Sequence, residues 1–299
     1  RFDMPDLIAR NLLTTRPAQT QQHEQIPGIT MIGDVSQNIG ENEEYPVVGL
    51  AAQWVVMPSM LKNGFMLPIT EETIREDKTG QVMDRARQAI DWLAINQEKE
   101  RLNTILGTTQ SFRWMNNSPQ ATYADTHTGF DFDNLVASNA LEDYTDIDAV
   151  WNVAEGVNDP HTGEPVALNG NVDIIIPQAL SSRATIVLQA EFIRMGAISG
   201  SVPMMQANNP LRQDARIGNR GYRVHSSTYI ASIQGNSTTW YMGQFKDAFE
   251  DREMWPLQMF VEDRNSTKGF ERDWVTRIKV RRKSVPGVRR PWKVFKCTA

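Results

Sequence analysis

The stretch FMLPITEETIREDKTGQVMDRARQAIDWLAINQEKERLNTILG, residues 65–107, sets the framework of this chain. It joins an apolar segment, an acidic helix start and one long helix. Pro68 ends the apolar segment, and Thr70 can accept hydrogen bonds from the first backbone N–H groups of a following helix. Glu71 and Glu72 then fall in the first helical turn, where carboxylates face the positive end of the helix dipole.

A second and longer helix is predicted from about Gln81 to Leu106. Its apolar residues recur with helical spacing, and opposite charges such as Glu98 and Arg101 follow one another on its other face. At ~1.5 Å per residue this helix would be about 39 Å long. A helix of that length can form the backbone of a domain.

Bulk composition excludes several classes of protein. The 299 residues are 40% hydrophobic and 22% charged, which is ordinary for a globular chain with one large core or two modest ones. The net charge of -5 argues against a protein that coats nucleic acid over its whole surface. No apolar run approaches the ~20 residues of a membrane span. The lone Cys297 excludes an intramolecular disulfide and a cysteine-based zinc site, and it fits a reducing compartment.

The segments before the acidic helix predict parts that pack poorly alone. Residues 14–45 are rich in Gln, Gly and Asn and lack periodicity, so we expect an extended arm that contacts another chain. Residues 46–69 predict two strands, QWVVM and GFMLPI, about a turn at Asn63-Gly64. An isolated hairpin is marginally stable in water, so this hairpin should lie against something else.

The middle and the end of the chain predict mixed α/β structure. A helix near 146–156 is followed by a buried strand, VDIII at 172–176, and by a helix from Pro177 to about Met195. The last third contains four strand candidates, SSTYIASI, TTWYMGQF, WPLQMFVED and DWVTRIKVRR.

Few residue patterns predict chemistry. The acids Glu71, Glu72, Glu76 and Asp77 could form a catalytic pair, but a capped, solvated helix start is the favoured interpretation because only Arg75 and Lys78 lie nearby. The acidic segment ATYADTHTGFDFDN, with Asp125, His127, Asp131 and Asp133, lacks the spacing of a calcium loop and predicts a polar turn. The four histidines show no metal-ligand spacing, and no nucleotide-binding or hydrolase motif is present. We therefore predict no catalytic residue, no metal and no cofactor.

The C-terminal end is strongly basic. From Arg277 onward there are nine cationic residues and no acid. Strand alternation places Arg277, Lys279 and Arg281 on one face, opposite Trp274, Ile278 and Val280. This face could bind nucleic acid or could pair with acidic segments of a neighbouring subunit, such as GENEEY (40–45) or DAFEDRE (247–253). The negative net charge favours the neighbouring subunit. The predicted inter-subunit contacts are Lys62, Glu71, Glu72, Arg277, Lys279, Arg281 and Arg282.

The order of these parts resembles that of the major capsid proteins of tailed bacteriophages, which have the Hong Kong 97-like capsid fold. Residues 65–107 look like the end of that family's extended loop running into its spine helix. YMGQFKDAF, WPLQMFVEDRN and DWVTRIKVRRKSVPGVRRPWKVFK are similar to its closing segment, with an E-D-R turn, an aromatic-led strand and a basic end. The likeness in element order covers nearly the whole chain.

The resemblance implies an α+β fold with five parts. They are an N-terminal arm at 1–45, an extended β-hairpin loop at 46–69, a peripheral domain at 70–125 with the spine helix at 81–106, an inserted axial α/β domain at 126–235, and closing peripheral strands at 236–299. Arm and loop would reach onto neighbouring subunits.

Two further expectations concern processing. The chain begins at Arg1 without a methionine, which suggests trimming or the proteolytic removal of a scaffolding segment known in this family. The length of the encoding gene tests this. Some members crosslink a loop lysine to an asparagine of another subunit, and Lys62 is the only candidate there. Because no partner asparagine or catalytic acid can be matched, we expect a solvated turn lysine and no crosslink.

The implied function is a non-enzymatic, self-assembling shell protein. Its copies would form hexamers and pentamers in an icosahedral head around double-stranded DNA, assembled in the bacterial cytoplasm and located in the virion, with portal, scaffold or decoration proteins as further partners and no membrane. The alternative is an encapsulin, a cellular compartment of the same fold that holds enzyme cargo. A hydrolase with an acid pair is a distant third and predicts a monomer or small oligomer.

Overall fold

The computed structural model describes residues 7–20, 23–27, 53–77, 80–109, 112–129, 132–159, 163–165, 168, 170–189, 192–195, 205–209, 211, 221–262 and 274–299. The elements in chain order are α1 (Ala9–Leu12), β1 (Thr14–Pro17), β2 (Gln25–Pro27), β3 (Trp54–Val56), β4 (Leu61–Thr70), α2 (Glu71–Glu76), α3 (Gln81–Ile105), β5 (Leu135–Val136), α4 (Tyr144–Glu155), β6 (Val172–Pro177), η1 (Gln178–Leu180), α5 (Ser181–Gln189), β7 (Phe192–Met195), β8 (Met205–Asn208), β9 (Tyr222–Ser227), α6 (Thr228–Gln234), β10 (Trp240–Gly243), α7 (Phe245–Ala248), β11 (Phe249–Glu262), β12 (Trp274–Val288), η3 (Pro291–Lys293) and β13 (Val294–Cys297).

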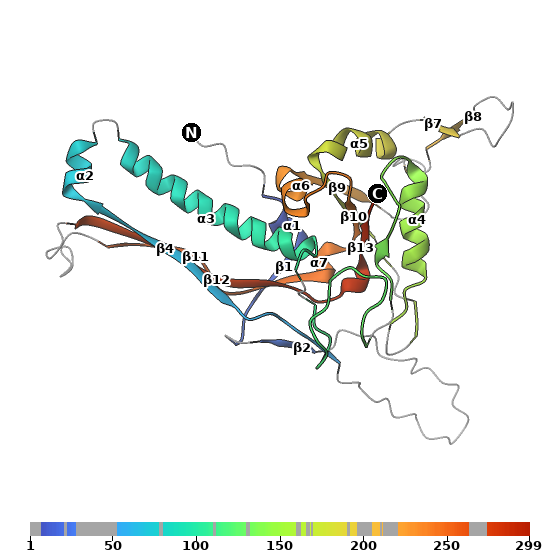
Figure 1. Cartoon of the computed structure of the whole chain (residues 1–299), viewed down its shortest axis with the longest axis horizontal. Coiled ribbons are helices and arrows are strands. Elements are labelled where there is room, and N and C mark those ends of the chain that lie inside the picture. The colour runs from blue at the N-terminus through green and yellow to red at the C-terminus, as the bar shows by residue number, and fades with distance from the viewer. Residues whose placement is uncertain are drawn as a thin grey trace, which may run out of the picture.

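An elongated half of the molecule is built on α3 and a long sheet. The strand order is β1-β11-β12-β4, with β1 parallel to β11 and the other pairs antiparallel. Figure 1 shows α3 running above this sheet, with α2 at the far end of β4. A small apolar cluster around Ile69, Leu93, Ile278 and Val280 joins the helix to the strands.

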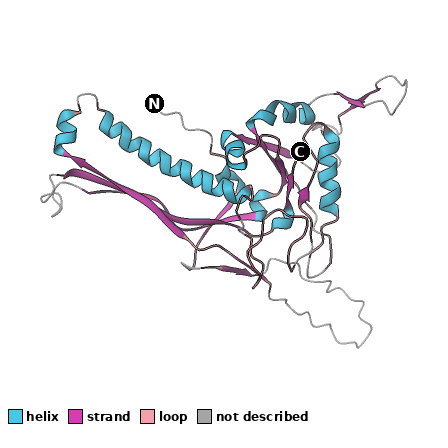
Figure 2. Cartoon of the chain, in the orientation of Figure 1, coloured by secondary structure: helices cyan, strands magenta, loops and turns pink. Residues whose placement is uncertain are grey.

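A more compact half surrounds the second sheet, of order β5-β13-β10-β6-β9. Helices α4, α5 and α6 lie around it in Figure 2. The largest core of the described residues includes the fully buried Trp240, Tyr241 and Phe295 of this half and extends to α1 and the C-terminal end of α3. Burial on both faces explains why β6 and β10 are largely apolar; the one acid, Asp173 in β6, contacts His225 Nε2 at 3.0 Å.

Several expected elements are confirmed. Helix α3 covers Gln81–Ile105, α4 covers Tyr144–Glu155, and β6 covers Val172–Pro177. Helix α4 begins with a capping box in which Asp143 and Asp146 satisfy each other's backbone N–H groups. The mixed α+β class follows. Among the described helices, none is long and apolar enough to span a membrane.

The expected hairpin within 46–69 is wrong in its described part. Strand β3 pairs with β2, whereas β4 pairs with β12 over ten positions. Asn63-Gly64 is not a turn but lies inside β4, where a Cβ on Gly64 would come 2.4 Å from the carbonyl oxygen of Val280. Pairing along a long strand is more stable than a two-stranded hairpin, so β12 takes β4 as a partner.

Two other expectations also need correction. The segment SSTYIASI is mainly helical, because Ser227 caps α6 by accepting a hydrogen bond from Tyr229 N and Gly235 ends the helix in the left-handed conformation. The helix expected from Pro177 to Met195 is shorter, since α5 ends at Gln189 and β7 occupies Phe192–Met195. Residues 28–45 of the expected arm lie outside the described residues.

Candidate assembly surface

The two faces of the first sheet differ in chemistry. The face toward α3 carries Ile278, Val280 and Phe65 in the apolar cluster. The pairing register places the next residues along, such as Lys279 opposite Met66 and Lys283 opposite Lys62, on the other face. The predicted alternation of β12 is therefore confirmed for Lys279 and Arg281. A register shift between Trp274 and Thr276 alters it at the strand start.

The face away from α3 carries a cluster of cations around two aromatic rings. Arg281 lies 4.7 Å from the ring centroids of both Trp255 and Phe260, and it contacts Gln258 Oε1 at 3.3 Å. Lys62 and Lys283 lie 5.8 and 5.6 Å from the Trp255 ring, and Lys279 lies 6.0 Å from Phe260. We call this surface the cation face; it consists of Lys62, Lys279, Arg281, Lys283, Trp255 and Phe260.

The charges of the cation face repel one another. Lys62 and Lys283 are directly opposite across the β4–β12 pair, where like charges are destabilising. Among the described residues, Lys62, Lys279 and Arg281 form no ion pair with a carboxylate. Contact with the rings stabilises these cations only partly. An anionic partner would lower the free energy of this surface.

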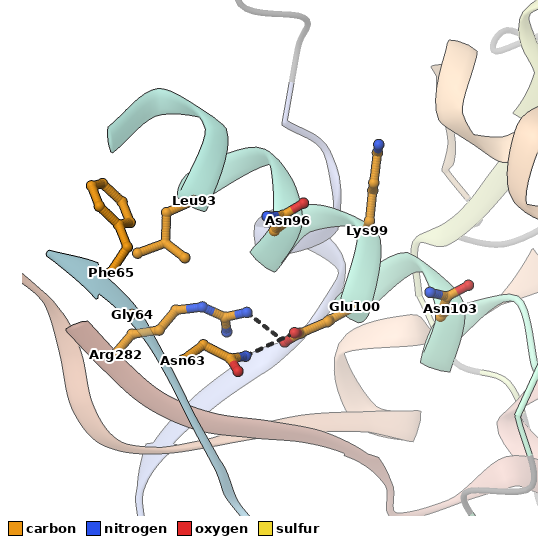
Figure 3. A pocket seen from close by; sticks show the side chains of 9 residues that line it. All are labelled: Asn63, Gly64, Phe65, Leu93, Asn96, Lys99, Glu100, Asn103 and Arg282. Atoms are coloured by element: carbon orange, nitrogen blue, oxygen red, sulfur yellow. Dashed lines mark hydrogen bonds and ion pairs between the residues drawn. The ribbon is translucent and has the colours of Figure 1, made fainter. Parts of the chain in front are cut away.

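Two of the predicted basic contact residues, Arg277 and Arg282, pair with acids inside the subunit. Arg277 pairs with Glu262 and lies 4.5 Å from the ring of Trp274. Arg282 points toward α3, is 1% exposed, and pairs with Glu100 at 2.5 Å. Figure 3 shows Arg282 and Asn63 converging on the Glu100 carboxylate.

A polar pocket of about 490 Å³ lies between α3 and β4, beside this ion pair. Asn96, Lys99 and Asn103 line it from the helix, and Gly64 and Phe65 line it from the strand (Figure 3). It contains one carboxylate, Glu100, which is already held by Arg282 and Asn63. No pair of free acids and no nucleophile with an adjacent base converges there. Among the described residues, no group of three or more His, Cys, Asp or Glu could hold a metal ion.

Helix α2 is an exposed acidic element. Thr70 caps it by accepting a hydrogen bond from Thr73 N at 3.2 Å, and Glu71 pairs with Arg75 at 2.6 Å, which confirms the predicted helix start. None of its residues is buried. Glu72 and Glu76 are exposed and four residues apart, a spacing at which like charges repel across a helical turn.

The ADTHTGFDFDN segment is a polar turn built around a buried histidine. His127 is 5% exposed, and its ring stacks on Phe132 with centroids 4.0 Å apart. Burial lowers the pKa of His127, although hydrogen bonds to backbone groups and the nearby Asp133 oppose this. The ring is therefore held neutral and serves packing. Asp131 lies outside the described residues.

Buried contacts of charged residues are a feature that sequence reasoning missed. Glu98 and Arg101, expected on the helix face opposite the apolar residues, are 2% and 8% exposed. Glu98 Oε1 accepts a hydrogen bond from Ala9 N at 2.7 Å, so it anchors α1 to α3. Arg101 pairs with the fully buried Asp251 of β11 at 2.5 Å. No local pattern could reveal pairs separated by 89 and 150 residues.

An exposed apolar row on β11 was also missed. Leu257, Met259 and Val261 alternate along the strand and are 39%, 56% and 60% exposed. The register places Met259 beside Val280 and Val261 beside Ile278. These residues therefore lie on the face of the sheet toward α3, but the helix packs on other strands of that face and leaves the β11 residues exposed. Alternate apolar residues in the segment WPLQMFVED were the available signal.

Comparisons with known proteins agree on one family. A family model described as phage capsid protein matches residues 55–297. The capsid structure of cyanophage P-SCSP1u is similar, with a TM-score of 0.58 at 13% identity, over 100% of this chain and 90% of that one. The capsid of a native GTA particle gives a TM-score of 0.56 at 12% identity, over 99% and 91%. Gordonia phage Cozz gives 0.56 at 11%, over 100% and 89%. A comparison with curated proteins finds no match.

Proposed function

Because the chain belongs to the phage capsid protein family and acts as a major capsid protein of tailed phages, we propose that its copies form an icosahedral head around double-stranded DNA. Its role is structural, it assembles with itself into a shell, and its place is the virion. The family match over residues 55–297 carries this conclusion. The α+β, Hong Kong 97-like fold agrees with it, and an encapsulin is not favoured.

The finer parts of the proposal concern organisation and partners. The division into arm, extended loop, peripheral domain and axial domain supplies a rigid body with segments that reach onto neighbours. In such a head the copies of the chain form hexamers and pentamers. The further partners are a scaffold, a portal, decoration proteins and the packaged DNA. We further propose that the protein carries no catalytic activity and assembles in the host cytoplasm. Among the described residues, Lys62, Lys279, Arg281 and Glu72 have no ion pair within the subunit, which supports their role as inter-subunit contacts. Glu71 is a weaker candidate because Arg75 pairs with it. Arg277 and Arg282 are weaker candidates because each has a carboxylate partner in its own chain.

Electron microscopy and sedimentation of the purified protein test the proposal. We expect closed particles of megadalton mass with five-fold vertices. A homogeneous monomer or small oligomer, under conditions that preserve the native fold, would contradict it. Sequencing the genes beside the coding gene separates the two shell types, because terminase and portal genes accompany a phage head and a cargo enzyme gene accompanies an encapsulin.

A further inference from the structure

We propose that the cation face of one subunit binds helix α2 of a second copy of this chain, through Glu72 and Glu76. The inference rests on the proposed function and names the surfaces that pair. The sheet face supplies Lys62, Lys279 and Arg281 without a carboxylate partner among the described residues, and α2 supplies two exposed carboxylates on one side of a helix.

Each surface is electrostatically unfavourable alone, and the two are complementary. Lys62 and Lys283 face each other across two strands, and Glu72 and Glu76 face each other across one helical turn. Bringing the acids over the cations adds attractions that offset both repulsions. The exposed ring of Phe260 provides apolar surface between the charges.

The acidic segment DAFEDRE is a poorer partner for the cation face than α2. In DAFEDRE, Glu250 and Asp251 are 1% and 0% exposed and pair with arginines of their own subunit. Asp247 is held by Lys293 at 2.8 Å. The segment GENEEY lies outside the described residues. Compared with DAFEDRE, α2 keeps two exposed carboxylates, Glu72 and Glu76, available for a partner.

Within one subunit, α2 follows β4 beyond the last cation of the cation face. At ~3.3 Å per residue, Thr70 lies about 26 Å along β4 from Lys62 and about 13 Å from Met66, the residue opposite Lys279, so we assign the contact to α2 of another copy. Helix α2 also stays at the end of the sheet where α3 begins, because only four residues lie between Glu76 and Gln81 (Figure 1). Since donor and acceptor surfaces are different parts of one chain, the contact is head-to-tail and generates rings when the rotation closes.

Charge reversal with rescue tests the pairing in the full chain. The face variant K279E/R281E and the helix variant E72K/E76K are each expected to lower the assembled fraction about tenfold or more, because like charges then meet at the contact. Their combination restores opposite charges and should return assembly to near the wild-type level. R223E/K246E is the control for the face variant. It makes the same charge change as K279E/R281E, but at exposed residues of β9 and α7, and should assemble normally.

One further variant separates loss of pairing from loss of folding. K62E loses the contact with the Trp255 ring and gains an opposite charge beside Lys283, so the unassembled subunit should unfold at a temperature close to that of wild type while assembly falls. A residue with a purely structural role would lower both quantities. Assembly of the wild type should also weaken between about 50 and 500 mM NaCl, as the charges become screened.

Several results would overturn the pairing. One is a combined variant that assembles no better than the worse single variant. Another is normal assembly of K279E/R281E or of E72K/E76K. Loss of double-stranded DNA binding by K279E/R281E, with shells that form normally, would assign the face to nucleic acid instead. If the wild type forms no particles, the proposed function itself fails; if it forms particles but charge rescue is absent, only the pairing fails.

Discussion

The buried pair between Arg101 of α3 and Asp251 of β11 makes a quantitative test of the elongated half. Asp251 is fully buried, and its Oδ2 accepts hydrogen bonds from Arg101 Nε at 2.8 Å and Nη2 at 2.5 Å. Its Oδ1 has no hydrogen-bond partner among the described residues. Arg101→Met therefore leaves a buried carboxylate without compensation, which costs about 3–5 kcal/mol of the free energy of unfolding.

This loss converts into a measurable temperature shift. Unfolding entropies near 2.1 cal/mol/K per residue give about 0.6 kcal/mol/K for a chain of this length, so a loss of about 4 kcal/mol lowers the Tm by roughly 6 °C. The assay is thermal unfolding of unassembled subunits, followed by circular dichroism. Urea unfolding should give a lower midpoint with an unchanged slope.

Two companion variants sharpen this test. Arg87→Met removes an exposed pair with Asp84 at 3.5 Å and should change stability by less than about 0.5 kcal/mol. R101M/D251L removes both charges and should recover most of the loss, because no buried ion is left unpaired. A loss below about 1 kcal/mol for Arg101→Met, or a double variant as unstable as the single one, would refute the reasoning.

Three further predictions concern other parts of the chain. Burial raises the pKa of Glu98 above its ordinary 4.5, so the contribution of Glu98 to stability is greatest below pH 4.5 and is lost as pH rises through the raised pKa. Glu98→Gln should therefore raise the free energy of unfolding at neutral pH and leave it unchanged at low pH. Unfolding measured as a function of pH tests this. Gly64→Ala should destabilise by about 1–3 kcal/mol in urea unfolding, because its Cβ would lie 2.4 Å from the Val280 oxygen; wild-type stability would contradict the close approach. Met259→Lys should leave subunit stability within about 0.5 kcal/mol but reduce assembly in sedimentation, and unchanged assembly would show that the apolar row of β11 stays exposed in the shell.

Local sequence was sufficient where an element depends on its own residues. The start of α2 at Thr70 follows from capping and the helix dipole, and α3 follows from apolar periodicity. Strand β6 follows from a short apolar run followed by proline.

Tertiary structure alone decided what depends on distant partners. Strand β4 pairs with β12 rather than with β3, although the Asn63-Gly64 dipeptide favoured a local turn. The register of β12 places Arg281 on the cation face and Arg282 beside Glu100 on the opposite face. Composition cannot predict which arginine lies on which face, because a register shift of one residue exchanges the two faces.

The sequence by itself determined the order of the elements, the long helix and the charge of the last strand. The tertiary structure determined which of those charges are neutralised within the subunit and which remain for a neighbour. The physical reason is that capping and periodicity act over a few residues. Strand register and the desolvation of ion pairs are set instead by segments that meet only after the chain has folded.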